Sequence, residues 1–453
     1  MNKQRSPGFK LGMTVLIGAL LAIPLFMVYA LVWDRQSQSE TARASVAEGW
    51  GGPQMLAGPV MVIPYRQQSV ETVTENGRAT SRAVTVEREL YLAPVLNKAA
   101  VAVSPERRVK SIYETVVYEA RVKGDARFAL PADLARFGVK PEELLLDRAE
   151  IRIGISDARG LLADNGIAMA GKALPLRPGK GLGATNGSGF FAFADWSGGI
   201  GAPLDVAYRF GVRGNGQLTL IPDAEATEWT ITSKWPHPSF GGQFLPNARN
   251  VTDSGFSARY AISNLALGRA VVQLPQAGDM ASREVSQGAQ IDLIEPVNLY
   301  SQVDRAIKYG FLFIGFTFLA FLMFDIIAGA RVAAAEYLLT GAGLILFFVL
   351  LLAFAEIIGF TLAYLAASGA IIGLISTYSA AVLGSRQRAG FIAGLLLGLY
   401  ALLYVLLNLE AYSLIIGSVL LFVALAAVMY VTRAVDWSGI GKREGDAAGE
   451  TTP

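Results

Sequence analysis

Few residues in this chain have a type and spacing that suit chemistry. The 453-residue sequence has one histidine, His237, and no cysteine. Thiol nucleophiles, disulfides, Cys-ligated zinc and multi-histidine metal sites are therefore excluded. Ser239 follows His237 closely, but no Gly-x-Ser-x-Gly elbow frames it, and the surrounding prolines and glycines favour a rigid turn at a sheet edge. We expect no catalytic residue, no metal ligand, no cofactor and no enzyme activity.

Two carboxylates, Asp325 and Glu356, lie nearest to long apolar stretches, and intramembrane carboxylates are functional candidates by default. As helical residues, Asp325 lies about 24 Å beyond Tyr309 and Glu356 about 28 Å beyond Tyr337. These depths correspond to opposite membrane boundaries. We therefore expect both carboxylates at interfaces, and keep proton or ion coupling as the alternative for them.

The apolar stretches that must position these carboxylates are long enough to cross a membrane. Residues 11–33 would form a helix of about 34 Å, against a hydrocarbon core of about 30 Å. A cleaved signal peptide is the alternative, but the run is longer than a typical signal h-region, so we favour an uncleaved anchor. A second apolar block gives five more predicted spans, for about six in all: 309–328, 337–357, 361–383, 389–407 and 412–431.

Glycines spaced four residues apart allow helices to approach closely. Two such series occur in the later spans: Gly369 with Gly373, and Gly390 with Gly394 and Gly398. We predict that they pack helices together within one bundle. Dimerisation is the alternative.

The distribution of Lys and Arg predicts the orientation. Basic residues cluster on one side of the predicted spans: Lys3, Arg5, Lys10, Arg331, Arg386, Arg388, Arg433, Lys442 and Arg443. The opposite short loops, 358–360 and 408–411, have neither Lys nor Arg. By the positive-inside rule, both termini are cytoplasmic and the segment 34–305 lies outside the cytoplasm.

The segment 34–305 is far too long for a loop and is patterned as strands. Its start, 35–48, is expected to extend the first helix, which the sequence Trp50-Gly51-Gly52-Pro53 ends. Period-two alternation then recurs, as in Ile151, Ile153 and Ile155, and predicts an antiparallel, sandwich-like domain. The Gly- and Pro-rich stretch 176–189 is expected to be a mobile loop or a break between subdomains. The domains are thus 1–33, 34–305, a five-helix bundle at 306–433, and a disordered cytoplasmic tail at 434–453.

Several motifs, in this order, resemble those of the CreD-type inner-membrane proteins of Gram-negative bacteria, the cell-envelope integrity family. The resemblance covers about 31–437 and rests on Trp50-Gly51-Gly52-Pro53-Gln54, Ile112-Tyr113-Glu114, Pro238-Ser239-Phe240-Gly241-Gly242 and Arg305-Ala306-Ile307-Lys308-Tyr309-Gly310. The chain departs from the family at Ala355-Glu356-Ile357, where Ser-Glu-His is common, so no histidine-based role is expected there. The resemblance implies a bacterial inner-membrane location, a periplasmic domain, and a part in envelope integrity and in stress or antimicrobial response, without implying a reaction.

Composition limits the partners. A net charge of +2 over the whole chain gives no basic footprint for nucleic acid, and 53% hydrophobic residues fit a lipid bilayer as the main partner. We rank first a non-enzymatic envelope factor whose periplasmic domain binds an envelope protein or a cell-wall component. A transporter or lipid-handling protein ranks second, since the last five spans lack proline and have few polar residues. A membrane-bound enzyme ranks third.

Overall fold

The computed structural model describes residues 7–75, 78–110, 113–198, 201–274, 287–294, 299–326, 332–408 and 413–433. The chain forms two compact units, one of Met1–Ser39 with Val297–Pro453 and one of Glu40–Pro296. The first unit is helical and the second is built from strands. The predicted disordered tail, 434–453, lies outside the described residues.

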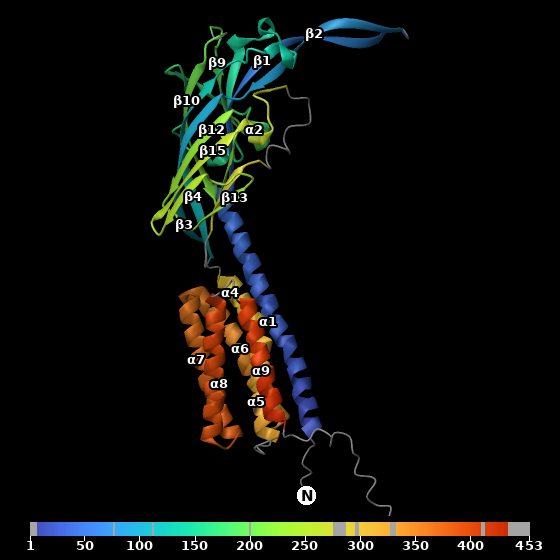
Figure 1. The fold of residues 1–453 in the computed structure, drawn as a ribbon, viewed down its shortest axis with the longest axis vertical. Helices are drawn as coiled ribbons and strands as arrows, with labels where there is room; N and C mark the ends of the chain where they lie inside the picture. Colours follow the sequence, from blue (N-terminus) through green and yellow to red (C-terminus); the bar gives the residue numbers. More distant parts are fainter. Residues whose placement is uncertain are drawn as a thin grey trace, which may run out of the picture. The chain divides into compact units, whose positions relative to one another are not determined.

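The helical unit contains the membrane-length helices (Figure 1). Its helices are α1 (Pro7–Trp50, which continues into the other unit), α4 (Leu299–Lys308), α5 (Gly310–Ile326), α6 (Ala334–Ile358), α7 (Phe360–Val382), α8 (Arg386–Asn408) and α9 (Ser413–Thr432). Among the described residues, five helices are long and apolar enough to cross a membrane: Phe9–Val46, Leu299–Asp325, Ala334–Ile358, Phe360–Val382 and Arg386–Asn408. The sixth predicted span, 412–431, coincides with α9, which has 20 residues and no charged side chain.

Helix α4 begins ahead of the predicted second span, which was placed at 309–328. Tyr300, Val303 and Ile307 are buried, whereas Asp304 and Lys308 form an i,i+4 ion pair on the polar side. Apolar residues at this spacing form one face of a helix. The predicted domain boundary at 305 therefore falls inside a helix.

The structure describes only some of the residues on which the predicted membrane orientation rests. Lys3, Arg5, Arg331, Lys442 and Arg443 lie outside the described residues, as does most of the predicted loop 408–411. The orientation therefore remains a prediction from the sequence.

The strand-rich unit contains two sheets. One has the order β13-β17-β11-β1-β5-β9-β8, with β2 and β16 attached through β1; the other has the order β14-β15-β12-β3-β4-β10-β6-β7. The first sheet's strands are β1 (Gln54–Glu75), β2 (Arg78–Leu92), β5 (Ala149–Ile155), β8 (Leu176–Pro178), β9 (Gly189–Ala194), β11 (Gln217–Ile221), β13 (Pro238–Gly242), β16 (Val272–Gln273) and β17 (Ala289–Leu293). The second sheet's strands are β3 (Leu96–Lys110), β4 (Tyr113–Phe128), β6 (Gly166–Met169), β7 (Lys172–Leu174), β10 (Leu204–Asn215), β12 (Ala226–Ser233), β14 (Ala248–Thr252) and β15 (Gly255–Ser263).

One core joins the inner faces of the two sheets. It includes Met61 and Ile153 from the first sheet and Tyr118, Phe210 and Ile231 from the second. Buried residues alternate with exposed ones along β10 and β12, as expected for strands that cover a core on one face. The predicted β-rich sandwich is confirmed.

The expectation of purely antiparallel pairing is wrong, because both sheets are mixed. Strand β1 pairs in parallel with β11, and β3 pairs in parallel with β12. A parallel pair needs a long crossover connection, and here about a hundred or more residues separate the partners. Local alternation contains no information about such a distant partner.

Two expectations concern connecting segments. Helix α1 runs unbroken through 35–48 to Trp50 and ends at Gly51, so the predicted extension of the first helix is confirmed.

The stretch 176–189 is not a mobile loop. Strand β8 pairs with β9, a 3₁₀ turn forms at Gly183–Thr185, and Leu182 and Thr185 are buried. Its glycines thus serve tight turns in an ordered segment.

Candidate functional site

Asp325 lies near the end of α5 and is 2% exposed. Its Oδ1 accepts a hydrogen bond from Lys10 Nζ at 2.9 Å, and Lys10 also donates to the Asp325 carbonyl oxygen at 3.2 Å. The backbone N–H of Val332 donates to the same carboxylate at 3.4 Å. The sequence identified Lys10 only as an orientation signal, because nothing in the sequence pairs residues so far apart.

Glu356 lies near the end of α6 and is half-buried. Its Oε1 accepts a hydrogen bond from the Tyr300 hydroxyl at 3.1 Å. Tyr300 belongs to α4, so this contact joins two helices of the same unit.

His237 is exposed, and in the described part of the chain no hydrogen bond joins it to Ser239 or to an acid. It precedes β13, whose outer position in the sheet agrees with the predicted turn at a sheet edge. The neighbouring Trp235 is buried, and its Nε1 donates to the Ile294 carbonyl oxygen at 3.0 Å. Within the described residues, no group of three His, Asp or Glu side chains is arranged to hold a metal ion.

Among the described residues, no neighbour lies close to any of the five glycines predicted to pack helices. A Cβ built on any of Gly369, Gly373, Gly390, Gly394 and Gly398 would meet no atom within 4 Å. Dimerisation therefore remains the open alternative for these glycines. Close approach occurs at two other glycines, Gly310 and Gly341, where an added Cβ would meet Leu25 and Phe348, and Leu21 and Phe318, respectively.

The strand-rich unit contains a network of charged side chains centred on Arg152. The Arg152 and Glu150 side chains are each 6% exposed and are joined by hydrogen bonds of 2.7 and 2.9 Å. Arg152 also binds Glu89 at 2.5 Å and the Tyr91 hydroxyl at 3.1 Å, while Lys180 donates to Glu150 at 2.6 Å. Burial raises the pKa of Tyr91 to about 12, with the Glu89 charge adding to the effect.

The same network affects Glu89 in the opposite direction. Burial alone would raise the pKa of Glu89, but the hydrogen bond and charge of Arg152 outweigh it and lower the pKa below its ordinary value. The carboxylate is therefore held in its ionised form. The cluster joins β2, β5 and the segment after β8 through paired charges.

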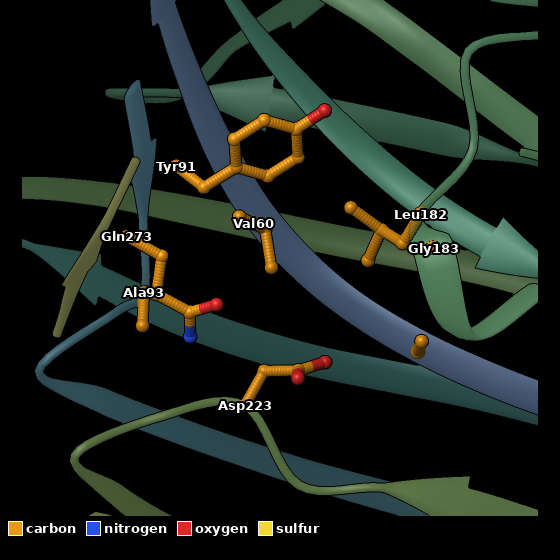
Figure 2. A pocket seen from close by; sticks show the side chains of 8 residues that line it. Val60, Tyr91, Ala93, Leu182, Gly183, Asp223 and Gln273 are labelled. Carbon is orange, nitrogen blue, oxygen red and sulfur yellow. The ribbon is translucent and has the colours of Figure 1, made fainter. Parts of the chain in front are cut away.

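A small hollow lies beside this network (Figure 2). Its volume is about 30 Å³, which suits a single water molecule. Figure 2 shows Val60, Tyr91 and Leu182 on one side and Asp223 and Gln273 on the other. Asp223 accepts hydrogen bonds from the Gly58 N–H at 2.8 Å and from Arg269 at 3.1 Å. The hollow is too small for an organic ligand.

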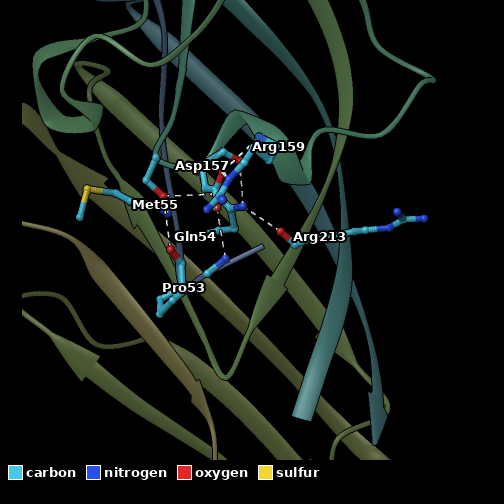
Figure 3. Close-up of polar contacts among 8 residues, drawn as sticks. Pro53, Gln54, Met55, Asp157, Arg159 and Arg213 are labelled. Carbon is cyan, nitrogen blue, oxygen red and sulfur yellow. Dashed lines mark hydrogen bonds and ion pairs between the residues drawn. The ribbon is translucent and has the colours of Figure 1, made fainter. Parts of the chain in front are cut away.

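A second polar cluster holds the start of β1 (Figure 3). The buried Gln54 side chain donates to the carbonyl oxygens of Arg213 at 2.7 Å and Asp157 at 3.1 Å. The hydrogen bond and charge of Arg159 lower the pKa of Asp157, although burial opposes this effect. Trp50 lies close by, with Arg108 at 3.6 Å and Arg213 at 4.3 Å from its ring centre. These contacts fix the junction between α1 and β1.

The strongest candidate site is an open groove of about 580 Å³ on the outer face of the second sheet. Its floor consists of small residues, and its polar lining carries four cations and two carboxylates. The floor residues are Ala100, Ala102, Gly211, Thr230 and Thr232; the charged residues are Arg121, Lys123, Arg209, Arg213, Glu119 and Asp164. No local sequence pattern indicates this groove, because four strands from distant parts of the chain form it.

One wall of the groove comes from the segment after β5. Leu162 lies over Gly211, where a Cβ would overlap its side chain, and the Leu162 N–H donates to the Gly211 carbonyl oxygen at 2.8 Å. The Gly211 N–H in turn donates to Asn165 Oδ1 at 3.3 Å. The glycine thus lets the wall seat directly on β10.

Membrane-length helices in one unit and a β-sandwich inserted after the first helix define a polytopic membrane protein with one large extramembrane unit. A family model described as "Inner membrane protein CreD" matches residues 6–438. The chain is also 32% identical over 454 residues to "Inner membrane protein CreD" of Escherichia coli (strain K12), covering 97% of this chain and 96% of that protein. The chain therefore belongs to the CreD family, and the match supports an inner-membrane location.

Proposed function

We propose that this chain is a non-enzymatic inner-membrane protein that supports envelope integrity and the stress or antimicrobial response through a periplasmic binding domain. The observation that carries the proposal is the open, charged groove on the outer face of β3, β4, β10 and β12. Pockets with a few convergent polar groups are typical binding sites. Family membership and the charge distribution of the loops support the location on which the proposal rests.

The orientation is tested with two reporters. Alkaline phosphatase inserted between Glu75 and Arg78, the ends of β1 and β2, is expected to be active, because this enzyme matures only outside the cytoplasm. A fluorescent protein fused after Glu450 is expected to fluoresce, since it folds in the cytoplasm. An inactive phosphatase together with a dark fluorescent protein would contradict a periplasmic strand-rich unit.

The binding role is tested by photo-crosslinking in intact cells. A photoreactive residue at Ala102, on the groove floor, is expected to give discrete adducts with an envelope protein or a cell-wall component. The control is the same residue at Ala83, which is exposed on β2 and outside the groove. Identical adduct patterns at the two positions would remove the groove as the binding site.

The second candidate function is transport or lipid handling, and the ion pair of buried Asp325 with half-buried Lys10 favours it. Buried hydroxyls of Thr317, Thr340 and Ser379 add to this, since they have no hydrogen-bond partner in the described part of the chain. Polar groups within membrane helices are typical of transport paths.

This second candidate predicts a specific outcome for Asp325→Asn. Loss of the envelope phenotype at normal protein abundance would support ion coupling, because the variant keeps the shape and removes the charge. Two outcomes would show that the pair is structural. Either Asp325→Asn retains the phenotype, or it loses the phenotype and the double variant Lys10→Met with Asp325→Leu regains it. The comparison variant is Glu356→Gln, which keeps an acceptor for the Tyr300 hydroxyl.

A further inference from the structure

We propose that the groove on the second sheet binds a bisphosphorylated saccharide, with Arg121 and Lys123 as its principal phosphate ligands. This inference rests on the proposed binding function and names the ligand class of the same site. Three features of the described residues carry it: like charges that face each other across two strands, the small cross-strand neighbours of Arg121, and the spacing of Arg121 and Lys123 beside threonine hydroxyls.

The first feature is an unfavourable pair of like charges. Lys123 on β4 lies directly opposite Arg209 on β10 in the antiparallel register. Like charges at directly opposite positions destabilise a sheet. Arg209 contacts Asp164 at 3.2 Å, but both side chains are well exposed, and such a surface pair compensates little. A bound phosphate would relieve this repulsion.

The second feature is the isolation of Arg121. Its cross-strand neighbours are Ala102 on β3 and Gly211 on β10, so no large side chain flanks it on either strand. Arg121 and Lys123 are both exposed, and no ion pair involves either of them within the described residues. An exposed Arg side chain without an ion pair can bind a phosphate through two parallel hydrogen bonds.

The third feature is the spacing and the floor. Arg121 and Lys123 point to the same face of β4, about 6.8 Å apart along the strand, which separates two phosphate positions. Thr230 and Thr232 of β12 lie opposite Ala100 and Ala102, respectively, and supply hydroxyls beside the cations. The groove volume of about 580 Å³ fits a ligand larger than inorganic phosphate.

Other ligand classes fit the groove less well. The only aromatic side chain in its lining is Phe210, which is buried in the core, so nucleic-acid bases find no stacking platform. A long polyanion is disfavoured because Glu119 and Asp164 already pair with Arg213 and Arg209, respectively, which leaves fewer cations for a chain of negative charges. An acidic peptide is the nearest rival and is an outcome of the test.

The test uses the full chain in lipid nanodiscs, with fructose 1,6-bisphosphate as the probe and isothermal titration calorimetry as the readout. We expect saturable binding that Arg121→Gln combined with Lys123→Gln weakens by about tenfold or more, since charged hydrogen bonds to phosphate are lost. The matched control is Arg82→Gln with Arg88→Gln, which removes two exposed charges from β2. This control is expected to bind the probe as the unmodified chain does.

A second variant tests whether the groove itself is needed, without changing its charge. Ala102→Phe fills the floor at an exposed position without altering any charge, and is expected to weaken binding similarly. Absent saturable binding, equal weakening by the β2 control, or tighter binding of a glutamate-rich peptide would overturn the inference. If the probe fails while crosslinking from Ala102 still gives discrete adducts, the proposed binding function stands and only this ligand class is rejected.

Discussion

At the residue scale, the Arg152 network shows how a strand-rich unit tolerates buried charge. Glu150 and Arg152 occupy alternate positions of β5 and lie on the same face of the sheet, away from the main core. Each buried oxygen of Glu150 has a partner, one from Arg152 and one from Lys180. Satisfied in this way, a buried pair is tolerated, whereas removing one partner leaves an uncompensated charge.

Arg152→Met is therefore expected to lower the free energy of unfolding by about 3 kcal/mol or more, because Glu150 stays buried without its main partner. Urea denaturation followed by tryptophan fluorescence measures the loss. The control is Arg127→Met, since Arg127 and Asp205 are both largely exposed and such a surface pair contributes little to stability. Equal effects of the two substitutions would contradict a buried network.

The lowered pKa of Glu89 predicts how stability depends on pH. A carboxylate whose pKa is lower in the folded state stabilises the fold above its unfolded value, here 4.5, and loses this contribution as pH falls through the folded value. The unmodified chain should therefore exceed Glu89→Gln in stability at neutral pH. The difference should shrink on acidification below about 4.5. A difference that stays constant from neutral to acidic pH would refute this role.

At the scale of elements, glycines contribute to helix packing only where the tertiary fold brings a neighbour close. Gly341 of α6 lies against Leu21 of α1 and Phe318 of α5, although it belongs to no predicted glycine series. The series ending at Gly398 satisfies the spacing rule, yet faces no neighbour within the described bundle. Spacing identifies a helix face that permits contact, but the neighbouring helix decides whether contact occurs.

Gly341→Leu is expected to lower the free energy of unfolding of the helical unit by about 1–3 kcal/mol, because the added side chain overlaps Leu21. Retention of folded protein after heating in detergent, read by size-exclusion chromatography, measures the effect. Gly394→Leu is the matched control and should leave stability unchanged, since the space around Gly394 is open. A loss of dimer in the Gly394 variant would instead show that the glycine series mediates self-association.

At the scale of the whole molecule, the strand-rich unit has its own core and its own closed network of polar contacts. The core includes residues of both sheets, from Leu56 to Leu293. A fragment spanning Glu40–Pro296 is therefore expected to be soluble and to unfold cooperatively. Circular dichroism with urea titration tests this expectation. A random-coil spectrum would show that the helical unit is needed for the sandwich to fold.

The sequence by itself determined the features that depend on local pattern. Apolar runs longer than a bilayer core predicted the spans, and alternation along segments such as Glu228–Ser233 predicted strands of a sandwich. The i,i+3 and i,i+4 pattern of Tyr300, Val303 and Ile307 is local as well, and it corresponds to the buried face of α4. Family membership followed from motifs in a shared order.

Only the tertiary structure decided which distant residues meet. It paired Lys10 with Asp325, set β11 beside β1 and β12 beside β3, and placed Arg121 and Lys123 over a floor of small residues. Hydrophobic periodicity fixes which face of a strand or helix is buried, because that depends on neighbours in the chain. This periodicity does not determine which strand or helix packs against that face, because the choice depends on contacts between residues far apart in the sequence.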